Sequence, residues 1–175
     1  MKLFVVLFLL IFTTSTEREK IAWSKDYKLS WSDFKAKTAG GVGFVASTNS
    51  GISFFYEYKI KNDIPEINYT VTSNFYPQLS WYDKNVANDY ILKHEQTHFD
   101  ISELFARILR KNISETTFTK NVKEELDALY ETSEKERRKL QKKFDLETDH
   151  SKIKVQEHKW ETFVAKQLEE YEQWN

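Results

Sequence analysis

The chain has 175 residues, a formal net charge of −1 and 40% hydrophobic residues. The apolar content predicts a folded core, and the balanced charge excludes attraction to nucleic acid or an anionic membrane through an excess of one sign. The absence of cysteine excludes disulfide bonds and thiolate-ligated zinc. Any exported domain built from this chain must therefore be stabilised by its core, with or without a metal.

Residues 1–16 have the pattern of a secretory signal peptide. Lys2 supplies a positive charge, residues 3–12 form an apolar run, and small polar residues follow. The run is too short for a membrane-spanning helix of about 20 residues. We therefore expect cleavage near residues 14–16, export to the periplasm or extracellular space, and no stable membrane insertion afterwards. Residues 17–175 are expected to form a single domain.

Residues 27–81 carry the patterns of β-strands. The stretch YKLSWSDF, residues 27–34, is typical of a short strand, and apolar residues alternate with polar ones over much of 52–59 and again over 66–76. Asn-Asp-Ile-Pro at 62–65 predicts a turn between these two runs. Together the patterns predict a small antiparallel sheet in the N-terminal half.

From about residue 85 the pattern becomes helical. Apolar residues recur at three- and four-residue steps from Ile91 to Leu109, with Asn85 or Asn88 as the expected N-cap and an end near 111–112. A second helix is expected from Ser114, and a third after an interruption at residues 145–151. The charged run 131–143 is expected to face solvent. The predicted fold class is α+β.

The first of these helices contains His94-Glu95-Gln96-Thr97-His98. Residues four apart lie one turn above each other, so His94 and His98 could bind one tetrahedral zinc. Glu95 points about 100° away from His94 and could take a proton from water beside the metal. The pattern thus predicts a Zn²⁺ site with two ligands and Glu95 as the catalytic base.

A catalytic zinc needs a third protein ligand, which the motif does not supply. Glu103 lies half a turn away from the His face, and the spacing instead predicts an ion pair with Arg107. We take His150 as the third metal ligand, because it lies where the helical pattern breaks and restarts. Three carboxylates could take this place instead: Glu147, Asp149 and Glu157.

Three stretches carry a resemblance to a known family: LSWSDFKAKT, LKHEQTHFDISELFARILRKNI and FDLETDHSKIKVQEHKW. In this order they resemble the landmarks of the bacterial family catalogued as domain of unknown function 922. The resemblance implies a zincin-like fold, His94 and His98 as ligands, Glu95 as base, and the third ligand in the Glu-Thr-Asp-His block. Ser151 departs from the family pattern, in which glycine is expected.

The predicted function is an exported zinc-dependent metallopeptidase. Water on zinc would attack a peptide carbonyl of a protein or peptide substrate, with Glu95 as general base. One alternative is a zinc-binding protein of the cell envelope that acts through interactions and not through catalysis. Another is a zinc hydrolase of a non-peptide amide bond.

Overall fold

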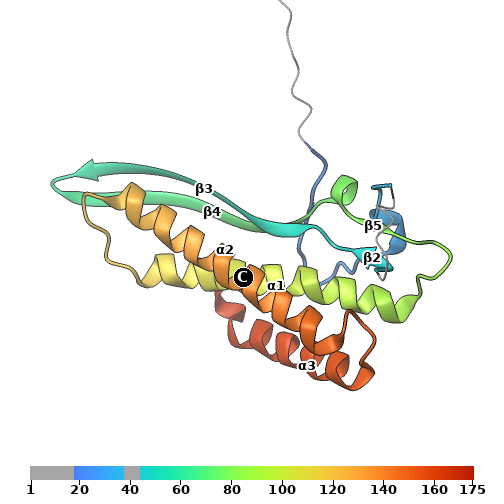
Figure 1. Ribbon diagram of the computed structural model, residues 1–175. Coiled ribbons are helices and arrows are strands. Elements are labelled where there is room, and N and C mark those ends of the chain that lie inside the picture. The colour runs from blue at the N-terminus through green and yellow to red at the C-terminus, as the bar shows by residue number, and fades with distance from the viewer. Residues whose placement is uncertain (1–17, 38–43) are drawn as a thin grey trace, which may run out of the picture.

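The computed structural model describes residues 18–37 and 44–175 of the chain (Figure 1). The predicted signal peptide, residues 1–16, lies outside them. The fold is α+β, with small antiparallel sheets followed by three helices, as predicted. The strands are β1 (Ile21–Ala22), β2 (Ala46–Ser47), β3 (Ser50–Lys61), β4 (Ile64–Phe75) and β5 (Trp81–Tyr82). The helices are α1 (Asp89–Glu115), α2 (Val122–Thr148) and α3 (Lys154–Glu170), besides three short 3₁₀ helices at Trp31–Asp33, Pro77–Leu79 and Glu172–Trp174.

The long hairpin β3–β4 forms most of the sheet. Its strands pair from Ser50↔Phe75 to Lys61↔Ile64, and Asn62 with Asp63 makes the connection. Both loop residues have positive φ, which is the geometry of the two-residue turn that matches the twist of a hairpin. β1 adds a short third strand beside β4, and β2 pairs with β5 in a separate two-stranded sheet.

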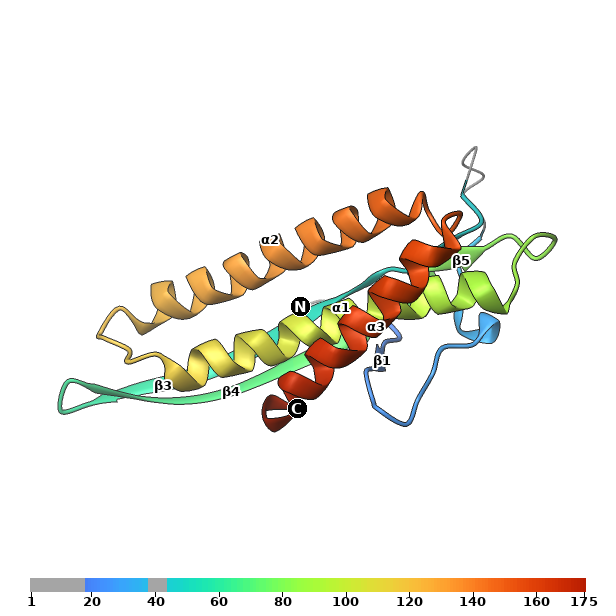
Figure 2. The ribbon, with the colours of Figure 1, turned by 90° about the horizontal axis from the view of Figure 1, so that it is seen from below.

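α1 is the central element of the fold. It contacts β3 and β4 on one side and both α2 and α3 on others (Figures 1 and 2). The inward face of the hairpin packs on its C-terminal half, in a cluster of buried side chains. This cluster comprises Ile52, Val71, Ala106, Leu109, Ile113, Val122 and Leu126.

The helix boundaries confirm one of the two predicted N-caps and correct two predictions, the end of the first helix near 111–112 and the start of the second at Ser114. Asn88 is the N-cap of α1, and its side chain accepts hydrogen bonds from the Tyr90 and Ile91 amides. α1 continues to Glu115, so Ser114 belongs to its last turn and does not start the next helix; α2 begins at Val122. Ser114 donates its hydroxyl hydrogen bond to the carbonyl of Lys111, within the same helix.

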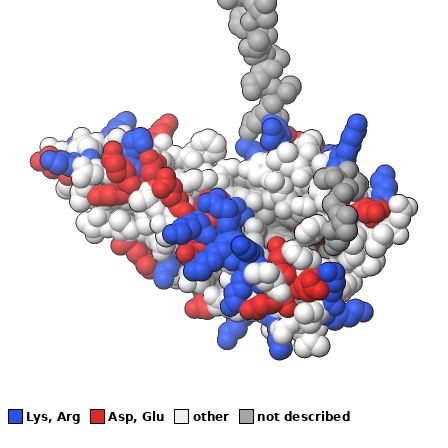
Figure 3. Space-filling model, in the orientation of Figure 1, with Lys and Arg blue, Asp and Glu red and all other residues white. Residues whose placement is uncertain are grey.

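Two further predictions were wrong. Residues 27–34 form no strand but contain the short 3₁₀ helix Trp31–Asp33. The charged run 131–143 is only partly solvated: Figure 3 shows charged side chains on the outward face of α2, but Glu134 and Arg137 are buried against α1 and β3. Within the described residues, no helix is long and apolar enough to cross a membrane.

Candidate metal centre

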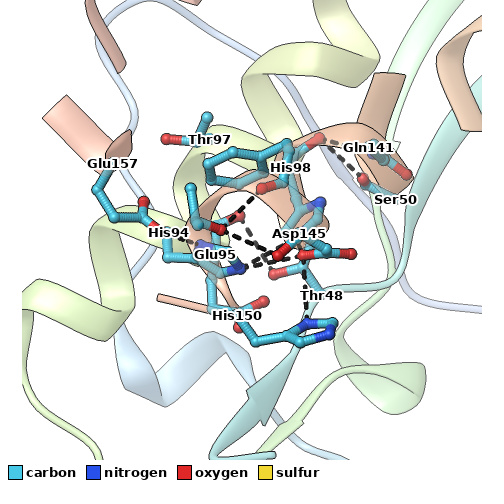
Figure 4. A network of polar contacts seen from close by, with 12 residues as sticks. Thr48, Ser50, His94, Glu95, Thr97, His98, Gln141, Asp145, His150 and Glu157 are labelled. Atoms are coloured by element: carbon cyan, nitrogen blue, oxygen red, sulfur yellow. Dashed lines mark hydrogen bonds and ion pairs between the residues drawn. The ribbon is translucent and has the colours of Figure 1, made fainter. Parts of the chain in front are cut away.

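Three side chains from two helices converge at one point (Figure 4). His94 and His98 extend from neighbouring turns of α1, and Asp145 reaches them from the last turns of α2. The Nε2 atoms of the two histidines lie 3.3 Å apart. Asp145 Oδ1 is 3.3 Å from Nε2 of His94 and 2.9 Å from Nε2 of His98. We refer to His94, His98 and Asp145 as the metal cluster.

These separations match the edges of a small coordination polyhedron. Two ligand atoms about 2.0–2.1 Å from a tetrahedral zinc lie about 3.3–3.4 Å apart. Two edges of the triangle have this length and the third is slightly shorter. The three atoms could therefore hold a divalent metal with small side-chain adjustments, and they are the one such cluster found among the described residues. Two imidazoles and one carboxylate are a ligand set that suits zinc.

Asp145 was not among the residues singled out from the sequence. The helical pattern was expected to break at residue 145, whereas α2 continues to Thr148. Asp145 therefore lies on a regular helix, next to Phe144, whose buried ring contacts both histidine rings. The sequence held one signal, because the carboxylate of Asp145 directly follows the apolar residue Phe144. The spacing of residues in the sequence could not show which helix Asp145 faces.

Glu157 of α3 lies behind His94. Its Oε1 is 2.7 Å from Nδ1 of His94, and both side chains are almost fully buried. A proton on Nδ1 that is donated to this carboxylate leaves Nε2 free to face the metal, which is the arrangement that commonly orients ligating histidines. Glu157, one of the three carboxylates considered as third ligand, thus contacts a ligand from outside the metal cluster.

The electrostatics of the metal-free cluster follow from these contacts. Burial by itself lowers the pKa of His94, but hydrogen bonds with Asp145 and Glu157 outweigh it and raise that pKa to about 9. Burial likewise raises the pKa of Asp145, and the hydrogen bonds from His94 and His98 more than reverse this, so its pKa lies well below the usual range. The two carboxylates therefore hold a positive charge where the metal would lie.

Glu95 lines the same cleft as the metal cluster. This cleft has a volume of about 370 Å³, and β2, α1 and the segment after α2 border it. Glu95 is 4% exposed, and its Oε2 is buried without a hydrogen-bond partner. A buried carboxylate oxygen left unpaired is costly in free energy and is typical of functional sites. The predicted base therefore has an oxygen available beside the metal cluster.

His150 lies at the mouth of the cleft, outside the metal cluster. Its Nδ1 is 3.7 Å from Asp145 Oδ1, and its ring meets the edge of Phe44. Glu147 and Asp149, the two carboxylates beside it in sequence, are engaged elsewhere: Glu147 accepts a hydrogen bond from Trp160, and Asp149 is the C-cap of α2. That His150 binds the metal stays a prediction.

The backbone around His150 is unusual. Asp149, His150 and Ser151 all have positive φ, with 70° at Ser151. Three consecutive left-handed residues reverse the chain between α2 and α3 and turn His150 towards Asp145. A left-handed residue favours glycine, which is the residue expected at position 151 from the family pattern.

The chain is thus an α+β protein with a candidate metal centre between two helices. A family model described as "Bacterial protein of unknown function (DUF922)" matches residues 24–151. The match covers more than half of the chain, so the protein belongs to this family, as its three stretches predicted; the match includes the third stretch only as far as residue 151. No curated protein and no solved structure matches the chain.

Proposed function

We propose that the protein is a zinc-dependent peptidase of zincin type. His94, His98 and Asp145 hold the metal, and Glu95 is the general base. The observation that carries this proposal is the triangle of ligand atoms at tetrahedral spacing, with the unpartnered Oε2 of Glu95 in the same cleft. Bound zinc would act as a Lewis acid that polarises a water molecule and the substrate carbonyl.

The residues of the chain would move one proton during the reaction. Glu95 Oε2 accepts it from the attacking water, whose oxygen forms a bond to the carbonyl carbon. Glu95 then returns the proton to the amide nitrogen as the C–N bond breaks, so that a carboxylic acid and an amine leave. In this proposal Asp145 takes the third ligand position predicted for His150, and His150 at the cleft mouth would instead donate a hydrogen bond to the carbonyl oxygen as negative charge develops there.

The main chain of β2 favours a peptide as the substrate. The carbonyl of Val45 accepts a hydrogen bond from the amide of Asp83, and Ala46 is paired with Tyr82 as the next residue in the antiparallel ladder. Main-chain groups alternate in direction along such a ladder, so those of Ala46 point away from β5. Ala46 also lines the cleft, where an extended peptide could pair with it.

Substituting Glu95 with Gln tests catalysis separately from metal binding. Glu95→Gln should retain one zinc per chain and lose hydrolysis of an unfolded protein substrate by about 10²–10⁴-fold, the contribution of a positioned base. Zinc content is measured by elemental analysis and cleavage by mass spectrometry. His94→Ala is the matched variant that should lose the zinc as well.

The result also separates catalysis from the two competing functions. Zinc bound with no cleavage of any tested protein or peptide would favour a non-catalytic binding protein of the envelope. Cleavage of a non-peptide amide, with no cleavage of any protein or peptide, would support zinc-dependent hydrolysis of a different class of substrate. Export to the periplasm or extracellular space rests on residues 1–16, and cell fractionation of the full chain tests it.

A further inference from the structure

Next to the metal cluster, α1 and α2 meet through polar side chains. This polar layer consists of Glu134, Arg137 and Gln141 from α2, Ser102 from α1 and Ser50 from β3. Arg137 donates two hydrogen bonds to Glu134, and Glu134 in turn accepts one from the amide of Ile52. Partnered polar groups of this kind join two elements in one relative position, because a shift would leave several groups unpaired.

Gln141 connects the polar layer to a metal ligand. Its Nε2 donates to the main-chain carbonyl of His98 at 3.0 Å, and its Oε1 accepts from Arg137 at 3.0 Å. The same carbonyl accepts hydroxyl hydrogen bonds from Ser50 and Ser102. Both ends of the Gln141 amide are therefore paired, one with α1 and one with α2.

Asp145 depends on its helix for its position. Within the described parts of the chain, the hydrogen bonds and ion pairs of its carboxylate are with His94, His98 and His150. His94 also contacts the carboxylate of Glu157, whereas among the described residues Asp145 has no hydrogen bond with a carboxylate or a side-chain amide. It lies one turn after Gln141 on the same face of α2, so a contact that fixes Gln141 also fixes the start of the Asp145 side chain.

We infer that Gln141 is a positioning residue for the metal site. By binding the His98 carbonyl it fixes α2 along α1 at the register that brings Asp145 Oδ1 to ligand distance from both histidines. The inference rests on the proposed metal site, and it assigns to Gln141 an effect on metal affinity without contact with the metal.

The experiment is a competition titration of Zn²⁺ against a chromogenic chelator. Gln141→Leu, which keeps the approximate volume and removes the three hydrogen bonds of the Gln141 side chain, should weaken zinc binding by about tenfold, the lower range for residues that support ligands from outside. The visible spectrum of the Co²⁺-loaded variant should also change, because Asp145 is then held less well as a ligand. Gln141→Met, unbranched like glutamine, should behave in the same way.

Tyr130→Phe is the matched control. The hydroxyl of Tyr130 donates to the carbonyl of Ile52 at 3.2 Å, which is a single hydrogen bond between α2 and β3 away from the metal cluster. This variant should lower the melting temperature of the metal-free protein, though by less than Gln141→Leu, which removes three hydrogen bonds. Its zinc affinity and Co²⁺ spectrum should remain those of the wild type.

The possible outcomes are distinct. Weaker zinc binding in Gln141→Leu alone supports the inference. Unchanged affinity in Gln141→Leu, or equal weakening in both variants, overturns it and leaves the metal site standing. A wild-type chain that binds no zinc in the same titration overturns the metal site and the inference together.

Discussion

Two glutamates on α1, Glu95 and Glu103, are both buried and are held in opposite ways. Glu103 Oε1 accepts hydrogen bonds from Arg107 at 2.9 Å and from Arg110 at 3.1 Å. Glu95, which is 4% exposed against 2% for Glu103, has a buried oxygen with no partner and lines a cleft. The same residue type on one helix is thus paired at one position and left available at another.

The difference separates a structural carboxylate from one that we propose to be catalytic. A buried carboxylate oxygen that accepts hydrogen bonds from two guanidinium groups is held in one position and is not free to take a proton. An unpartnered carboxylate raises the free energy of the folded protein and is retained where the chemistry needs it. Burial alone therefore does not distinguish the two glutamates of α1, but their hydrogen-bond partners do.

Glu103→Gln should give the largest effect on folding. It removes one charge from a buried group and leaves Arg107 and Arg110 without their counter-ion, so the free energy of unfolding should fall by about 3–5 kcal/mol. Urea unfolding monitored by circular dichroism measures it. Zinc affinity of the folded fraction should stay unchanged.

Glu115→Gln is the control for that change, because Glu115 forms an exposed ion pair with Lys111 on the same helix. Exposed pairs contribute little, so this variant should be close to wild type. A loss as small in Glu103→Gln as in Glu115→Gln would contradict the structural role of Glu103.

The pH dependence of the metal-free protein tests a second pair of carboxylates, Asp145 and Glu157, which contact His94. In the folded chain burial lowers the pKa of His94, but Asp145 and Glu157 outweigh it and raise that pKa from 6.5 to about 9. The stabilisation is complete below pH 6.5 and is lost as pH rises through about 9. The free energy of unfolding should fall over this interval by up to about 3 kcal/mol. Urea unfolding in the presence of a chelator measures it.

Zinc should reverse this change of the free energy of unfolding with pH. The metal binds the deprotonated imidazole, so zinc affinity rises as pH increases from 6.5 to about 9 while the metal-free protein becomes less stable. The pKa of Asp145 is lowered, so its contribution is present above its ordinary value of 3.8 and is constant in this window. Equal slopes with and without zinc would show that His94 does not exchange a proton for the metal.

The spacing of residues along α1 predicted the pairing of Glu103, one of the two glutamates compared. The Glu103–Arg107 pair follows from its four-residue step, and the helix around His94 follows from its apolar stripe; the structure confirms both. These contacts lie within one or two turns of a single helix, where geometry is fixed by the helical repeat.

Contacts between helices could not be derived in this way. Asp145 meets His98 across 47 positions and Glu157 meets His94 across 63. Their approach depends on the register of α2 and α3 against α1, which no repeat in the sequence encodes. Charge patterning misled for the same reason, since Glu134 and Arg137 look solvated in sequence and are buried by β3 and α1.

The smallest expected effect concerns the stability of Glu95→Gln. An amide is less costly to bury than a carboxylate, so this variant should raise the free energy of unfolding of the metal-free protein by about 1 kcal/mol. Urea unfolding alongside Glu103→Gln gives the direct comparison, with opposite signs expected for the same chemical change on one helix. Destabilisation by Glu95→Gln would mean that its carboxylate is held by the fold as Glu103 is. The free Oε2 would then be no sign of a catalytic base.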